Sequence, residues 1–118
     1  MAVAIEECDF WWFRELYAVV VAFADAPEYT IGRIGGGQVS VPEDQAEDLG
    51  HYRECILTKY PSAADLAIMR LVAEFDAILA RRSLNGQEFE EAFWTNEAFQ
   101  RHPDWQMIRR KSQEFLLR

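Results

Sequence analysis

The sequence predicts a single compact α+β domain over residues 1–118, predominantly helical, with about five helices and one β-hairpin. Three observations lead to this class. Half of the residues are apolar and 14% are aromatic, which is enough for one hydrophobic core. Apolar residues recur at spacings of three and four along most of the chain, as they do on the buried face of a helix. One glycine-rich stretch lies between two short β-branched runs, as in a hairpin.

A first helix is predicted over residues 10–24. Asp9 can cap its start, and Pro27 follows its end. Trp11, Trp12 and Val19 lie off the expected buried stripe, so this helix is apolar more than halfway round. It is therefore either central in the fold or partly open to a partner. The expected buried stripe consists of Phe10, Phe13, Leu16, Tyr17, Val20, Val21 and Ala24.

The β-hairpin is predicted from the segments "YTIGRI" and "QVSV", with the three glycines of residues 35–37 as its turn. A phosphate-binding loop is the alternative for these glycines. Such a loop opens directly onto a helix N-terminus and usually carries a lysine. Here a strand-like run follows, and Glu43 and Asp44 at the start of the next helix repel phosphate. The pattern therefore favours the hairpin turn.

Two further helices are predicted over residues 42–58 and 63–82. Pro42 suits the first helical position, and the acids after it suit the positive end of the helix dipole. Ser62 and Asp65 resemble a capping box for the next helix. That helix has the clearest buried stripe in the chain: Leu66, Met69, Val72, Phe75 and Leu79.

The last part of the chain is predicted to hold a turn at Asn85 and Gly86, a helix over residues 87–94 and a short helical turn capped at Thr95 or Asn96. A fifth helix is predicted from Pro103 to the end of the chain. The residues that it is expected to bury are Trp105, Ile108, Phe115 and Leu116.

The charge distribution favours a basic protein partner. The net charge is -8, and residues 1–60 hold 11 acids against 4 bases, whereas the last 18 residues are basic. Such a surface repels phosphate backbones, which argues against direct nucleic-acid binding. It attracts a cationic protein surface instead. Plain solubility in the cytosol explains the same acidity and stays open as the alternative.

A cytoplasmic location is expected, with no membrane association. The N-terminal segment lacks the basic region of a secretory signal, and the longest apolar run covers only residues 16–24. The two cysteines, Cys8 and Cys55, do not form a disulfide framework, so we expect reduced thiols.

No catalytic residue, cofactor or metal is predicted. His51 and Cys55 lie four residues apart on one helix, but zinc normally takes three or four protein ligands, and His102 is far along the chain. His102 is more simply read as part of the start of a helix. The sequence has no G-x-S-x-G element, and its carboxylates lie in polar runs where water keeps them ionised. The sequence therefore predicts that the protein is not an enzyme.

Two acidic clusters are the candidate binding surface. The second of them adjoins Phe93 and Trp94, and a ring beside carboxylates combines an apolar anchor with electrostatic steering. The alternatives are a solvated helix face for the acids and core packing for the two rings. The predicted partner-binding residues are Glu43, Asp44, Glu47, Asp48, Glu88, Glu90, Glu91 and Trp94.

In size, acidity, aromatic content and lack of a catalytic motif, the whole chain resembles bacterial immunity proteins, which neutralise a cognate toxin inside the producing cell. The resemblance includes no family motif and assigns no residue roles. It implies a tight one-to-one complex that occludes a toxin domain, often a basic nuclease. Two other classes stay open: a homo-oligomeric structural or adaptor protein that associates through the apolar first helix, and an enzyme or small-ligand binder with a pocket between the helices and the hairpin.

Overall fold

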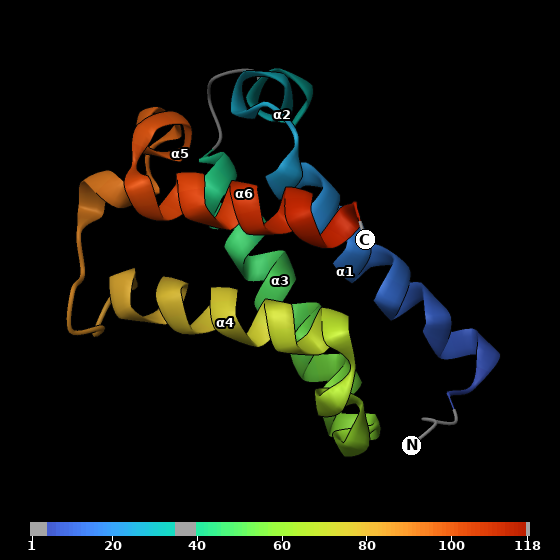
Figure 1. The fold of residues 1–118 in the computed structure, drawn as a ribbon. Coiled ribbons are helices and arrows are strands. Elements are labelled where there is room, and N and C mark those ends of the chain that lie inside the picture. The colour runs from blue at the N-terminus through green and yellow to red at the C-terminus, as the bar shows by residue number, and fades with distance from the viewer. Residues whose placement is uncertain (1–4, 35–39, 118) are drawn as a thin grey trace.

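The computed structural model describes residues 5–34 and 40–117. Within these ranges the chain forms six α-helices and three short 3₁₀ helices, labelled α and η (Figure 1). In chain order they are η1 (Glu7–Asp9), α1 (Phe10–Ala24), α2 (Pro27–Ile34), α3 (Val41–Lys59), η2 (Pro61–Asp65), α4 (Ala67–Arg82), η3 (Glu91–Trp94), α5 (Asn96–Arg101) and α6 (Pro103–Leu116).

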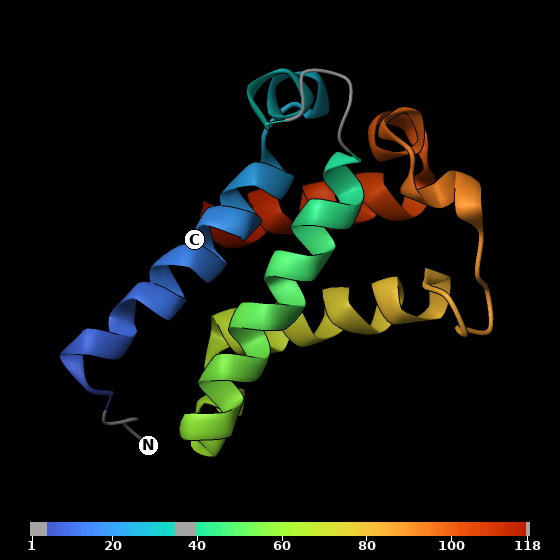
Figure 2. The same ribbon diagram turned by 180° about the vertical axis from the view of Figure 1, so that it is seen from behind.

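The four long helices form two crossed layers. Figure 2 shows α1 and α3 as an antiparallel pair in front, with α4 and α6 running across them behind. The reverse view shows α4 and α6 in front (Figure 1). Helix α1 packs against both α3 and α6, and α3 packs against α4. The short helices α2 and α5 lie at the end of the bundle where α3 begins.

An aromatic cluster centred on Trp105 fills the junction between the two layers. The Trp105 ring stacks on Phe93 with 4.9 Å between ring centroids and meets Phe99 edge-on at 5.1 Å. Phe23 of α1 contacts both Trp105 and Phe75 of α4. The indole Nε1 of Trp105 donates to the carbonyl oxygen of Phe93 at 3.0 Å, so the polar atom of this buried ring is satisfied.

The predicted β-hairpin is wrong for the described residues. No strand occurs in residues 5–34 or 40–117, and the whole of the first predicted strand, residues 29–34, lies in α2. Pro27 takes the first position of this helix, where proline needs no N–H partner. Thr30 is fully buried, and its hydroxyl donates to the carbonyl oxygen of Ala22 at 3.2 Å. Packing thus outweighs the weak strand preference of the β-branched residues. The glycine turn of residues 35–37 lies outside the described residues.

Helix α1 has the predicted bounds, but its buried face differs from the predicted stripe. Phe10, Tyr17 and Val21, which we expected to be buried, are exposed, whereas Val19 is buried. The helix is apolar on most of its circumference, so periodicity alone could not select the face that meets α3 and α6. Despite this apolar character, neither α1 nor any other helix in the described residues has the length and apolarity to cross a membrane.

The start of α4 and the segment before α5 differ from the predicted helices. Residues 61–65 form η2, and α4 begins only at Ala67, so the expected Ser62 capping box is not used. Of the helix predicted over residues 87–94, only η3 forms.

The turn predicted at Asn85 and Gly86 is confirmed. Asn85 has a φ of 73°, in the left-handed region that asparagine tolerates. A Cβ atom on Gly86 would lie 2.4 Å from the carbonyl oxygens of both Ala80 and Arg81, so only glycine fits there. The turn directs residues 83–94 back past the end of α4.

Candidate functional site

A pocket of about 470 Å³ lies between the first two turns of α3 and the segment that follows α4. It contains four of the eight predicted partner-binding residues, which come from parts of the chain more than 40 residues apart. Its lining residues are Glu43, Ala46, Glu47, Ser83, Leu84, Phe89, Glu91 and Trp94. We call this the acidic pocket.

The apolar part of the acidic pocket is built on Trp94. Its indole Nε1 donates to the carbonyl oxygen of Arg82 at 2.8 Å, and its own carbonyl oxygen accepts from the Ser40 hydroxyl at 2.6 Å. These bonds hold the ring in place while part of it faces the pocket. Leu84 and Phe89 are 74% and 46% exposed, which is high for apolar side chains of this size. The pocket therefore offers an apolar surface of its own beside the acids.

The start of α3 is attached to the same segment. The backbone N–H of Val41 donates to the side-chain oxygen of Asn96 at 2.9 Å, so Asn96 satisfies one of the free donors at this helix end. Glu43 and Glu47, four residues apart, project from one face into the pocket. Glu43 lies in the first turn of α3, at the positive end of the helix dipole.

The acids of the pocket differ from their neighbours in ion pairing. Glu88 pairs with Arg81 at 3.5 Å, and Glu90 pairs with Arg82 at 3.1 Å. The acids that line the pocket are Glu43, Glu47 and Glu91. Within the described part of the chain, these three carboxylates form no salt bridge. The second predicted acidic cluster is thus divided: one carboxylate faces the pocket, and two are neutralised by the chain itself.

The first predicted cluster is also divided. Asp44 and Asp48 do not line the pocket. Partial desolvation raises the pKa of Asp48 above its ordinary value, and the neighbouring Asp44 carboxylate raises it further. Glu15 of α1 adds a smaller effect in the same direction. Asp48 therefore lies on the side of α3 near α1, one helical turn after Asp44.

The histidines occupy separate sites. His51 Nε2 lies 3.8 Å from the Sγ of Cys55 on α3. His102 caps α6, as the sequence indicated: its Nδ1 accepts from the backbone N–H of Asp104 at 3.1 Å. The His102 ring packs edge-on against Phe93 with 4.9 Å between centroids. The structure thus does not bring His102 to His51 and Cys55.

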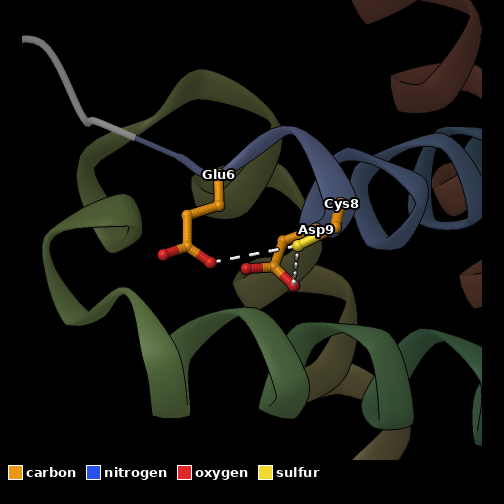
Figure 3. A group of neighbouring side chains, drawn as sticks. All are labelled: Glu6, Cys8 and Asp9. Atoms are coloured by element: carbon orange, nitrogen blue, oxygen red, sulfur yellow. Dashed lines mark hydrogen bonds between the residues drawn. The ribbon is translucent and has the colours of Figure 1, made fainter.

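The described residues hold one group of three acid, cysteine or histidine side chains close enough to share a metal ion: Glu6, Cys8 and Asp9 (Figure 3). Lys59 already supplies the positive charge there, because its Nζ lies 2.7 Å from Asp9 Oδ2 and 3.1 Å from Glu6 Oε2. The hydroxyl of Tyr60 donates to the same Asp9 oxygen at 2.5 Å. We call Glu6, Asp9, Lys59 and Tyr60 the N-terminal clasp. Asp9 stands at the start of α1, but its carboxylate makes no capping bond and serves the clasp instead.

The N-terminal clasp is expected to persist well into acid. The hydrogen bond from Lys59, followed by that from Tyr60, holds the pKa of Asp9 below its ordinary 3.8. Because the folded-state pKa is the lower one, the stabilisation is complete above the unfolded value and is lost only as pH falls through the folded value. Carboxyl-carbon NMR should place the Asp9 midpoint below 3.8, and Tyr60→Phe should move it upward. A midpoint at or above the ordinary value in the unaltered protein would contradict the clasp.

Trp94 was predicted as a contact residue, but sequence reasoning missed Leu84 and Phe89 of the pocket and the whole N-terminal clasp. Leu84 and Phe89 are isolated apolar residues in the polar segment "SLNGQEFEE", which is the one signal that could have marked them as surface contacts. Nothing in the local sequence connects Asp9 to Lys59, fifty residues away.

Comparison of the chain with protein-family models, curated proteins and solved structures finds no match.

Proposed function

We propose that the protein is a protein-binding inhibitor of the immunity type, which neutralises a basic toxin domain by covering its active or substrate-binding surface. The main observation that supports the proposal is the acidic pocket. It combines three carboxylates that lack a salt bridge to the described residues with the exposed apolar side chains of Leu84 and Phe89.

The pocket matches the two parts of an arginine or lysine side chain. The cationic group can pair with Glu43, Glu47 or Glu91, while its aliphatic stem lies along Phe89 and Trp94. In a basic nuclease, such side chains bind the phosphates of the nucleic acid. Carboxylates that take the place of those phosphates occlude the substrate site, so no catalytic group is needed on the inhibitor.

The charge of the whole chain supports rapid capture of such a partner. A net charge of -8 produces a field that steers a cationic protein towards the complex. Steering of this kind can raise association rates to about 10⁸–10⁹ M⁻¹s⁻¹ at low salt. We therefore expect association to slow as salt is added.

The experiment begins with capture of partners from the native host at low and moderate salt, followed by purification of the retained protein. Binding kinetics and the partner's own activity are then measured with a variant that carries lysine at Glu43, Glu47 and Glu91. The pocket variant should lose at least tenfold in affinity, equivalent to about 1.4 kcal/mol, and should no longer inhibit.

A control variant separates contact from steering. It carries lysine at Glu7, Glu28 and Asp65, which are exposed and lie outside the pocket, and it changes the net charge by the same amount. This control should mainly slow association while keeping inhibition. If both variants weaken binding equally, the pocket is not the contact surface. If the partner is bound but its activity is unchanged, the protein is not an inhibitor.

The second candidate function is homo-oligomeric assembly through α1. Phe10 and Tyr17 are 52% and 40% exposed on this helix, and the Tyr17 ring lies 6.0 Å from that of Phe115 on α6. Leu116 and Leu117, also exposed, extend the apolar surface at the end of α6. A sizing column distinguishes the two candidates: a dimer that forms without any partner and is lost on Tyr17→Glu supports assembly, whereas a monomer excludes it.

A further inference from the structure

An imidazole and a thiol, two groups that bind transition metals, lie on α3, away from the acidic pocket. His51 and Cys55 are one helical turn apart, so their side chains leave the same face of the helix. The Nε2 atom of His51 lies 3.8 Å from the Sγ atom of Cys55. Both line a separate pocket of about 380 Å³ together with Trp12, Glu54, Thr58 and Lys59.

The separation of the two ligand atoms suits a tetrahedral zinc-class ion. Zinc binds sulfur at about 2.3 Å and imidazole nitrogen at about 2.0–2.1 Å, which places two tetrahedral ligands about 3.6 Å apart. The observed 3.8 Å is close to this value without any change in the backbone. The His51 ring also packs edge-on against Tyr52 at 5.1 Å, which limits its orientations.

The charged side chains around His51 and Cys55 are compatible with a bound cation. Glu54 supplies a carboxylate to the same pocket. Lys59 also lines it, but its ammonium group is neutralised by Asp9 and Glu6 in the N-terminal clasp. The contacts of Lys59 also distinguish this site from the group of Glu6, Cys8 and Asp9. In that group, the Lys59 ammonium already occupies the place that a metal ion would take.

We propose that His51 and Cys55 form a two-residue binding site for a zinc-class divalent ion, with Glu54 balancing its charge. The thiol of Cys55 releases its proton to solvent as the sulfur binds the ion. Two protein ligands are fewer than the three or four that zinc normally takes, so water or a ligand from another molecule fills the remaining coordination positions. This site is independent of the proposed inhibitor function, because neither ligand lies in the acidic pocket.

Cobalt(II) is the probe, because its bond to a thiolate produces a charge-transfer absorption. Titration of the full chain should produce this band, and the band should saturate at one ion per chain and disappear when Zn²⁺ is added. Cys55→Ser should abolish the band, and His51→Ala should weaken binding at least tenfold. Cys8→Ser, which alters the other free thiol, is the matched control and should leave the titration unchanged.

Circular dichroism of each variant shows whether the helices remain intact. Both ligand side chains are at least partly exposed, so we expect the helices to tolerate the substitutions. Absence of a saturable band in the unaltered protein overturns the proposal. So does a band that survives Cys55→Ser but is lost on Cys8→Ser, since the ion would then lie at the N-terminal group.

Discussion

Replacement of Trp105 by alanine is expected to lower the free energy of unfolding by about 3–5 kcal/mol, the range for removal of a large buried ring. The side chain is 1% exposed and touches rings from α1, η3 and α5. Its loss leaves a cavity where the two helix layers meet, and it also leaves the Phe93 carbonyl without its donor. Urea denaturation followed by far-UV circular dichroism measures the change.

Two further variants separate the causes of this loss. Trp105→Phe keeps much of the ring volume but removes the hydrogen bond to Phe93, so it should cost less than alanine, about 1–3 kcal/mol. Trp11→Ala removes a ring of the same size that is 45% exposed, and it should cost less than either change at Trp105. Equal losses for Trp105→Ala and Trp11→Ala would contradict the position of Trp105 at the centre of the core.

Replacement of Arg82 by methionine is expected to lower the free energy of unfolding by about 2 kcal/mol, because hydrogen bonds between charged groups are lost. Arg82 is the last residue of α4. Its Nε and Nη2 both donate to Asp104 Oδ2, at 3.2 and 2.9 Å, and its Nη1 donates to Glu90 at 3.1 Å. The guanidinium also lies 5.5 Å from the centroid of the Phe93 ring. One side chain thus joins α4, α6 and the segment that carries the acidic pocket.

The neighbouring residue provides the control for Arg82. Arg81 pairs with Glu88 at 3.5 Å, but both side chains are more than half exposed, so Arg81→Met should change stability by less than about 0.5 kcal/mol. Arg82→Lys should recover only part of the loss, since an ammonium group cannot reproduce the planar fork. The same denaturation measurement applies. Full recovery with lysine would show that charge alone, and not the forked geometry, matters at this position.

The helix positions were largely predictable from local sequence. The predicted first helix has the bounds of α1, and those expected to start at Pro42 and Pro103 correspond to α3 and α6. Proline at a helix start and a glycine turn act within a few residues, so these signals need no tertiary context. The failed hairpin shows the opposite case. Its first β-branched residues became helical because the buried Thr30 bonds to the end of α1, eight residues earlier in the chain.

Half of the predicted contact surface came together, and the other half did not. Glu43, Glu47, Glu91 and Trp94 share the acidic pocket, whereas Asp44 and Asp48 do not line it. The sequence showed the acids as clusters, but a helix distributes consecutive residues around its axis. Whether a carboxylate forms an ion pair within the chain depends on the positions of cations such as Arg81 and Arg82. The sequence does not show which carboxylates these cations contact.

The sequence by itself determined the acidity of the chain, its helical character and the starts and ends of most helices, because these follow from composition and from contacts within a turn or two. The tertiary structure alone decided which face of α1 is buried, that Lys59 closes on Asp9, and that the start of α3 meets Trp94. These outcomes depend on the packing of helices that are distant in the chain. An apolar stripe indicates that a helix must pack, whereas the shapes and charges of all its neighbours together select its partner.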